Sequence, residues 1–436
     1  MPSGPTGHAG ELRLTLVTSA PVTAPVPQLV ARSVEIPDPG PLLSLLPDTS
    51  PYAWVRGGQG LVGWGEAARV ETSGAHRFAE LEAWWRTLIN TAVVRDEVQL
   101  PGSGPVAFGS FTFDDEPGTS TLVLPETIVG HRDGRWWVTT VSVAGNLPPL
   151  PTLPSATSVR RPGAISFADG QLTGADWEIV VASAVDRINA GELEKVVLAR
   201  DLVAESPHPI DTRWPLRRLG EHYSRCWTFS VDGLLGATPE LLVRRERGLV
   251  TSRVLAGTIR RTHDDVHDLA LAASLARSSK DLEEHEFAVR SVADALAPYC
   301  SSMNVPETPF VLHLSNVMHL ATDVTGVASG QASSLAMAAA LHPSAAVGGT
   351  PTDRAIELIR ELEGLDRGRY AAPIGWIDSA GDGEWGIALR CAQLDPSDPT
   401  RMRLFAGCGI VAGSNPAEEL AESAAKLIPM RDALVR

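Results

Sequence analysis

The alternation of hydrophobic and polar residues predicts mostly β-strands in the first third of the chain. A strand pattern occurs at residues 11–20, 52–55, 61–64 and 136–143. The glycine-rich segment 57–60 and the dipeptide Asp133-Gly134 have the composition of tight turns between paired strands. Apolar residues at helical spacing predict one helix at 75–90.

Helices and strands alternate irregularly after residue 164. Strand patterns occur at 195–202, 226–231, 234–237, 240–244 and 249–255, and one long strand is expected at 310–327. Helix patterns occur at 173–190, 279–297, 352–363 and from 416 onward. Hairpins joined directly, with helices between them, favour an α+β fold with a largely antiparallel sheet. The proline-rich segment 145–164 is expected to be an extended connector.

The composition is that of a soluble globular protein, with 44% hydrophobic and 20% charged residues. With 37 basic and 52 acidic residues the formal net charge is −15, which argues against binding to nucleic acid or to an anionic membrane. A length of 436 residues fits about three domains or one or two larger units.

The four cysteines have neither metal-binding nor disulfide-framework spacing, so free thiols in a reducing compartment are expected. The sequence starts without the features of a secretion signal, and it contains no apolar run long enough to span a membrane. We therefore expect a cytoplasmic protein.

Two ionisable residues stand among apolar strand residues, and the pattern leaves two interpretations of each. Lys195 shares a strand face with Val197 and Ala199, so it is either a lysine that protects an edge strand or a buried amine that can act as a base. Glu240 follows GATP at 236–239, so it is either exposed at a bend or desolvated and held protonated as an acid.

Carboxylates recur at helical spacing in two other places. Asp281 and Glu284 share one side of a helix, and Glu418 and Glu422 share one side of the last helix, where Lys426 follows. These residues either form solvated ion pairs or converge from two helices on a magnesium ion.

Two further patterns could line a site. Period-two counting along the long strand at 310–327 places polar residues on one side, facing either solvent or a cleft: His313, Ser315, His319, Asp323 and Thr325. The glycine-rich segment 407–413 is either a tight turn or a place where backbone N–H groups approach a carboxylate.

These patterns occur in the order found in one family. The matching stretches are KVVLAR at 195–200, GATPEL at 236–241, LAGT at 255–258, SKDLEEH at 279–285, HLAT at 319–322, LHP at 341–343 with Gly348-Gly349, RGRY at 367–370, GDGEW at 381–385, ALRC at 388–391, and the segment from Gly407 to Lys426. The region 165–436 therefore resembles the chorismate-utilising enzymes, and the region before it matches only loosely.

Within that family the resemblance is strongest to isochorismate synthase. Lys195 looks like the base that activates water in isochorismate and salicylate synthases, where anthranilate synthases usually carry glutamine. Ala256 stands where aminodeoxychorismate synthases carry a nucleophilic lysine, and the tryptophan-binding LLES motif of anthranilate synthases is missing from this sequence.

The resemblance implies an α+β fold of two large, mostly antiparallel sheets packed together with helices outside. It implies a variable N-terminal half of the fold at 1–147, a connector at 148–164 and a chorismate-binding catalytic region at 165–436. The implied reaction adds water at C2 of chorismate with loss of the 4-hydroxyl group, and its product feeds menaquinone or catechol siderophore synthesis.

The resemblance also implies roles for individual residues. Lys195 would be the base and Glu240 the acid, and Mg²⁺ would be held by Glu284 and Glu422 with Asp281 behind them. Substrate contacts would come from Gly257, Thr258, His319, Tyr370, Arg390, Gly407, Gly409 and Lys426, with Tyr370 and Arg390 on the enolpyruvyl carboxylate.

Other members of the family remain as alternatives. A salicylate synthase would also eliminate pyruvate, a step for which His319 would be needed. Less expected are an anthranilate or aminodeoxychorismate synthase component I and a non-catalytic chorismate-binding protein. We expect a monomer without a glutamine amidotransferase subunit, and Cys408, where alanine is common in the family, should matter little.

Overall fold

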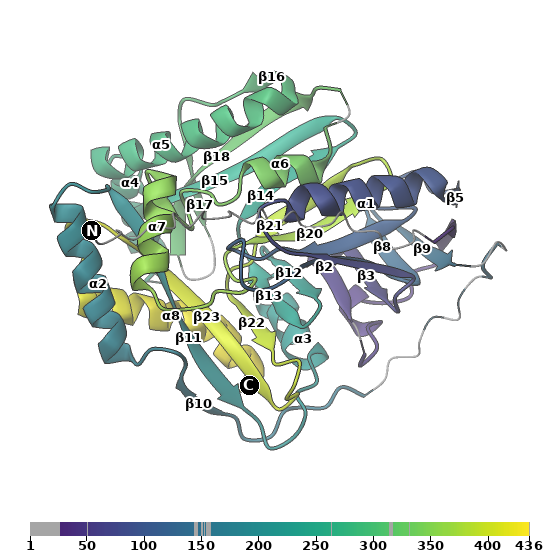
Figure 1. The fold of residues 1–436 in the computed structure, drawn as a ribbon, viewed down its shortest axis with the longest axis horizontal. Helices are drawn as coiled ribbons and strands as arrows, with labels where there is room; N and C mark the ends of the chain where they lie inside the picture. The colour runs from purple at the N-terminus through teal and green to yellow at the C-terminus, as the bar shows by residue number, and fades with distance from the viewer. Residues whose placement is uncertain are drawn as a thin grey trace, which may run out of the picture.

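The computed structural model describes residues 27–49, 51–143, 147–149, 151, 153, 158–262, 264–313, 317–330 and 332–435, without the side chains of Thr258, Lys280 and Glu284. The described chain forms two large β-sheets with helices outside them, which confirms the predicted fold class (Figure 1). The strand expected at 11–20 lies outside the described residues.

The larger sheet has thirteen strands, and among its described pairs β1 and β5 are parallel while the others are antiparallel. Its order is β10 (Ser166–Asp169), β11 (Lys195–Glu205), β23 (Arg401–Ile410), β22 (Cys391–Leu394), β13 (Leu234–Thr238), β12 (Trp227–Val231), β2 (Tyr52–Arg56), β3 (Gln59–Trp64), β8 (Thr127–Arg132), β9 (Arg135–Ser142), β1 (Val30–Ile36) and β5 (Val93–Asp96), with β19 (Gly349–Thr350) beside β11.

The smaller sheet has ten strands and is antiparallel throughout its described pairs. Its order is β16 (Cys300–Asn304), β18 (Val317–Ala328), β15 (Leu249–Arg260), β14 (Leu241–Glu246), β21 (Gly383–Ile387), β20 (Pro373–Asp378), β6 (Val106–Ser110), β7 (Ser120–Leu124) and β4 (Ala68–Thr72), with β17 (Phe310–His313) beside β18.

Strands from before and after the proline-rich segment pair directly in both sheets. In the larger sheet β2 pairs with β12, and in the smaller sheet β6 pairs with β20. The early strands therefore extend one end of each sheet, while the strands that carry the predicted site residues form the other end.

Each sheet has its own set of helices, which Figure 1 shows on the outside of the molecule. Helices α1 (Arg77–Thr91), α4 (Asp265–Leu275), α5 (Ser279–Leu296) and α6 (Ser334–Ala340) pack on the smaller sheet. Helices α2 (Gly174–Asn189), α3 (Arg213–His222), α7 (Thr352–Leu362) and α8 (Pro416–Val435) pack on the larger one. None of the helices in the described part of the chain is apolar over a length that could cross a membrane.

The core contains large aromatic side chains from both sheets. Trp54 of β2 and Trp385 of β21 are at most 1% exposed, as are Phe108 and Phe229. Trp54 Nε1 donates a 2.8 Å hydrogen bond to Glu384, so a buried polar contact also joins the two sheets.

The prediction of one long strand at 310–327 was wrong. The chain forms two strands there, β17 and β18, which pair antiparallel, with Leu312 opposite His319. His313 is therefore on the opposite face of the sheet from His319. Ser315 lies outside the described residues. Polar and apolar residues alternate in both strands, so the sequence pattern alone does not reveal that the chain changes direction between them.

Candidate active site

Lys195 begins β11, where it lies between β19 and β23. Its side chain is partly buried and passes over Gly409, because a β-carbon built on Gly409 would lie 2.9 Å from Lys195 Cε and 3.6 Å from Nζ. On the other side, a β-carbon on Gly349 would lie 2.1 Å from the Lys195 carbonyl oxygen. Glycine at both positions therefore leaves room for the lysine.

Gly407 lies two residues earlier on β23, which is a continuous strand here and not a tight turn. A β-carbon on Gly407 would lie 2.8 Å from the Leu198 carbonyl oxygen and 3.2 Å from the Tyr370 hydroxyl oxygen. Lys426 of α8 donates a 2.9 Å hydrogen bond from Nζ to the Gly407 carbonyl. This glycine thus brings a strand, a tyrosine and a lysine together.

Tyr370 is 4% exposed and stacks on Phe405, with ring centroids 5.2 Å apart. Burial raises the pKa of its hydroxyl well above the ordinary value, so the group stays a neutral hydrogen-bond donor.

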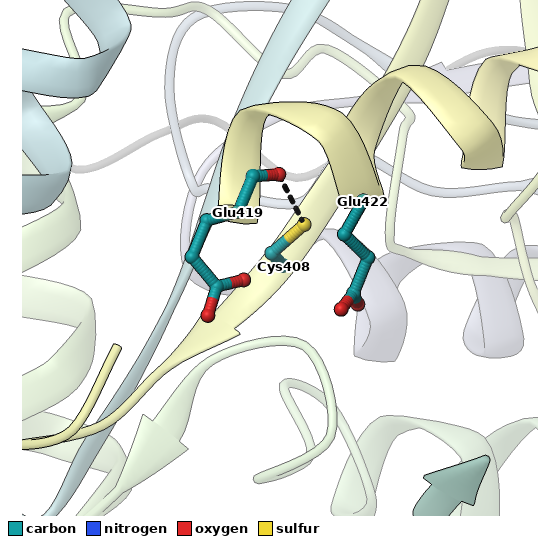
Figure 2. Close-up of side chains that lie close together, drawn as sticks. All are labelled: Cys408, Glu419 and Glu422. Carbon is teal, nitrogen blue, oxygen red and sulfur yellow. Dashed lines mark hydrogen bonds between the residues drawn. The ribbon is translucent and has the colours of Figure 1, made fainter. Parts of the chain in front are cut away.

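The first turns of α8 carry two carboxylates that point to the same side (Figure 2). Glu419, Glu422 and Cys408 each offer one ligand atom, and these atoms lie within 4.8 Å of one another. Cys408 donates from Sγ to the Glu419 carbonyl at 3.4 Å. Oxygen donors suit a hard cation such as Mg²⁺ and a thiol does not, so the two glutamates fit the ion that the resemblance implies.

The surroundings shift the pKa values of these two glutamates in opposite directions. Burial raises the pKa of Glu419, helped by the neighbouring Glu422, although a hydrogen bond with Ser414 acts to lower it. Burial also acts to raise the pKa of Glu422, but Lys426, paired with it at 2.8 Å, holds the pKa below its usual value together with more distant arginines. Glu418 is exposed and lies outside this cluster.

Glu240 lies between β13 and β14, directly before β14, which is an inner strand of the smaller sheet with β15 and β21 as neighbours. Burial raises the pKa of its carboxyl to about 7, although Arg390, Lys195 and Lys426 pull the value down. Of the two interpretations of this residue, desolvation agrees with the structure. A carboxyl with such a pKa is partly protonated at neutral pH, as a general acid requires.

His319 lies on β18 and is partly buried. Burial lowers the pKa of its imidazole to about 4, and the positive charges of Arg390 and Lys426 lower it further, while a hydrogen bond with the Gly257 backbone acts in the opposite direction. Gly257 has a φ of 77° at a bulge of β15, a conformation that glycine adopts easily. His319 is therefore neutral at pH 7.

Arg390 connects the two sides of the site. It lies between β21 of the smaller sheet and β22 of the larger one, with a φ of 49°. Its charge acts on Glu240 and His319 from one side and on Tyr370 and Glu422 from the other. A guanidinium in this position suits a substrate carboxylate.

Asp281 in the first turn of α5 lies close to the bulge, because a β-carbon on Gly257 would lie 3.3 Å from Asp281 Cβ. Glu284 follows on the same helix and Thr258 follows Gly257 on β15, but their side chains lie outside the described part of the structure. The predicted convergence of Glu284 with Glu422 thus stays a prediction.

The sequence interpretation missed an ion pair between Glu363 and Arg367, which are 1% and 3% exposed in their side chains. Glu363 accepts the Ala199 N–H at 2.8 Å, and Arg367 donates to the carbonyls of Val197 at 2.7 Å and Val347 at 3.0 Å. The pair therefore fixes the Lys195 strand against the segment that enters β19. Its signal in the sequence was a glutamate four residues before an arginine of the RGRY stretch.

A second missed residue is the histidine of the SKDLEEH stretch. His285 is 2% exposed and contacts Thr322 Oγ1 through Nε2 at 2.8 Å and the Ala256 carbonyl through Nδ1 at 3.3 Å. It joins α5 to β15 and β18 next to Gly257.

Cavities lie on both sides of the candidate site. One of about 200 Å³ is lined by Arg390, Arg261 and Pro239, and another of about 30 Å³ is lined by Glu240. A larger one of about 630 Å³ lies away from these residues, among α1, α6 and α7.

Comparisons with known proteins agree with this geometry. The model of the family described as "Chorismate binding enzyme" matches residues 48–435. Isochorismate synthase DhbC of Bacillus subtilis is 43% identical over 271 residues, which cover 59% of this chain and 67% of that protein. Isochorismate synthase MenF of the same organism is 33% identical over 403 residues, or 86% of this chain and 85% of that protein.

A solved structure from Bacillus anthracis, described as a candidate 2,3-dihydroxybenzoate-specific isochorismate synthase, superimposes with a TM-score of 0.74 at 33% identity. The superposition covers 91% of this chain and 99% of that one. The order of the matching sequence stretches, the paired sheets and these comparisons together identify the chain as a member of the chorismate-binding enzyme family.

Proposed function

We propose that this protein is an isochorismate synthase, which converts chorismate to isochorismate with Mg²⁺ as cofactor. The observation that carries the proposal is that the site has Lys195 on the larger sheet and a buried Glu240 carboxyl beside the smaller sheet, where burial raises the pKa of the carboxyl and the charge of Lys195 lowers it. A base and an acid on opposite sides of one site suit the addition of water at one ring carbon and the loss of a hydroxyl group from another.

In the proposed reaction Lys195, as the neutral amine, takes a proton from water while the water oxygen bonds to C2 of chorismate. The double bonds of the ring shift, and the C4–oxygen bond breaks. Glu240 gives its proton to the departing 4-hydroxyl group, which leaves as water. Lysine can serve as such a base because its amine can lose its proton, which arginine does not do in proteins.

The substrate carries two carboxylates, and the site offers donors for both. We assign the enolpyruvyl carboxylate to Arg390 and to the neutral hydroxyl of Tyr370. Further substrate contacts are assigned to Gly257, Thr258, His319, Gly407, Gly409 and Lys426. Neutral His319 donates or accepts a hydrogen bond there without adding charge.

Glu284 and Glu422 would hold the Mg²⁺, with Asp281 behind them. Glu419 joins this set on the structural observation that its carboxylate lies beside that of Glu422 (Figure 2). When bound, the ion would neutralise and orient the ring carboxylate of chorismate.

The proposal includes the finer expectations from the sequence. Water as nucleophile requires no glutamine amidotransferase subunit, and we expect a cytoplasmic monomer whose product enters menaquinone or catechol siderophore synthesis. The proposed site residues all come from the catalytic region 165–436, and the regions 1–147 and 148–164 would support it.

The test is incubation of the purified protein with chorismate in the presence of Mg²⁺ or EDTA, with products separated by chromatography. Formation of isochorismate with Mg²⁺ but not with EDTA supports the proposal. Salicylate with pyruvate would make the enzyme a salicylate synthase, and no turnover would contradict the assignment.

Mg²⁺ binding is tested separately by calorimetry, with the matched variants Glu422→Gln and Glu418→Gln. We expect the first to weaken Mg²⁺ binding at least tenfold, by analogy with the roughly 10–100-fold effect of losing a group that supports a metal ligand. The exposed Glu418 should have no effect, and equal effects of both variants would contradict this ligand set.

A further inference from the structure

A cavity of about 30 Å³ lies beside Glu240, between the β14–β15 hairpin, α5 and the segment that follows His342. This exceeds the roughly 10–15 Å³ of free space that one water molecule needs, and a polar wall makes such a space suitable for water. Its polar wall includes Glu240, Ser252, Ser291 and Ser344.

Ser344 has a buried hydroxyl oxygen without a hydrogen-bond partner among the described residues. Its backbone is fixed, because the Ser344 carbonyl accepts the N–H groups of Val347 at 3.1 Å and Gly348 at 2.9 Å. Arg367 holds the same segment through the Val347 carbonyl. A buried hydroxyl that cannot move to a partner is costly, so a partner in the cavity is expected.

Ser252 differs from Ser344 although it lines the same cavity. Its hydroxyl donates to the Leu242 carbonyl at 2.6 Å and is therefore already satisfied. For Glu240, the backbone N–H donates to Thr238 Oγ1 at 3.2 Å. Ser291 of α5 also lines the cavity, but it is exposed and bonds to solvent without help from the cavity. The carboxyl of Glu240 and the hydroxyl of Ser344 are thus the two remaining groups on this wall suited to a shared water molecule.

We propose that a water molecule in this cavity joins the Ser344 hydroxyl to the Glu240 carboxyl, which makes Ser344 a positioning residue for the acid of the reaction. The inference rests on the proposed function for its catalytic meaning. Ser344 keeps its own proton throughout, and the water donates a hydrogen bond to Glu240 before and after the carboxyl releases its proton.

The charged groups around Glu240 also affect the pKa of its carboxyl. Lys195 of β11, Lys426 of α8 and Arg390 favour the ionised carboxylate. Arg253 of β15 also lines the cavity, but it is paired with Asp323 at 2.7 Å. A hydrogen bond from the water favours the ionised form further, so its loss should keep Glu240 protonated to higher pH.

The first test is the pH dependence of kcat for Ser344→Ala, Ser344→Thr and Ser252→Ala. Because activity needs protonated Glu240, it falls as pH rises through the pKa of this carboxyl. We expect Ser344→Ala to lower kcat about tenfold. We also expect it to shift the fall of kcat at alkaline pH, the alkaline limb of the profile, to a pH about one unit higher. Ser344→Thr should keep the wild-type limb, and Ser252→Ala should not move it.

The second test reads the carboxyl directly and does not depend on turnover. Infrared difference spectra titrate the C=O band of protonated Glu240, which is assigned by its loss in Glu240→Gln. We expect the band to persist to higher pH in Ser344→Ala than in wild type. Should Ser344→Ala not fold, Ser344→Cys supplies the same comparison with a much weaker donor.

An unmoved band and an unmoved alkaline limb in Ser344→Ala would overturn the inference, as would equal shifts in Ser344→Ala and Ser252→Ala. A wild-type enzyme that forms no isochorismate, with a band that still moves in Ser344→Ala, would overturn the proposed function and leave the water contact standing.

Discussion

The two sides of the candidate site differ in charge. The side formed by the larger sheet and α8 carries Lys195, Lys426 and Glu422, with an ion pair between the last two. The side formed by the smaller sheet carries Glu240 and His319, which burial holds toward their neutral forms.

This difference indicates a division of tasks. Charged groups suit the binding of a substrate dianion and its counter-ion, while a protonated carboxyl suits proton delivery to a leaving group. Arg390 lies where the chain crosses from one sheet to the other, so its charge reaches both sides.

The largest expected effect is at Lys195. Replacement by alanine should lower isochorismate formation about 10³-fold, because the base is lost. Lys195→Arg keeps a positive charge that cannot be neutralised, so it should be as inactive. Steady-state rates with chorismate measure both variants. Activity retained by Lys195→Arg would mean that this position supplies charge and not a base.

The next effect concerns the buried ion pair of Glu363 and Arg367, which fixes the strand of Lys195. Glu363→Gln should lower the free energy of unfolding by about 3 kcal/mol, because it leaves the buried Arg367 without its counter-charge. Urea unfolding measures this loss. Glu361→Gln is the matched control, since Glu361 lies in the last turn of α7, which Glu363 follows as C-cap, but pairs with Arg187 near solvent. Equal stability of both variants would contradict a supporting role for the buried pair.

On the neutral side, Glu240→Gln should stabilise the protein at pH 8 although it removes the acid. The folded-state pKa of about 7 lies above the unfolded value of 4.5, so wild type loses stability as pH rises through this window. We expect a gain of about 2 kcal/mol at pH 8 and none at pH 4, after allowing for partial solvent exposure. A gain that is independent of pH would contradict desolvation of Glu240.

The smallest effect tests the glycine beneath Lys195. Gly409→Ala places a β-carbon 2.9 Å from Lys195 Cε and should lower kcat about tenfold by displacing the amine. Gly413→Ala is its control, since a β-carbon there has no atom within 4 Å. Comparable rates for the two variants would show that the lysine does not depend on this glycine.

The strands and their hairpins were predictable because their patterns are local, whereas the packing of two large sheets was expected only from the family resemblance. The hairpin of β2 and β3 and the hairpin of β8 and β9 follow from glycine-containing turns between alternating segments. The division of residues 310–327 into β17 and β18 was not predictable, because polar alternation runs on both sides of the reversal.

Fewer of the site residues could be predicted from the sequence, because the contacts that position them are made between segments far apart in the chain. Glu419 gave no signal, since its place beside Glu422 depends on how α8 lies against β23. One compositional signal was overlooked: the chain has only three lysines, at 195, 280 and 426, among 37 basic residues. Where arginine is used almost everywhere else, a lysine indicates a need for an amine.

The central claim is that Lys195 activates water for attack on chorismate. The most direct measurement is mass spectrometry of isochorismate formed by the wild-type enzyme with Mg²⁺ in water labelled with heavy oxygen. The account predicts one heavy oxygen atom in each product molecule, on C2. Isochorismate without the label would mean that the hydroxyl group is transferred from the substrate itself, which would contradict the role assigned to Lys195.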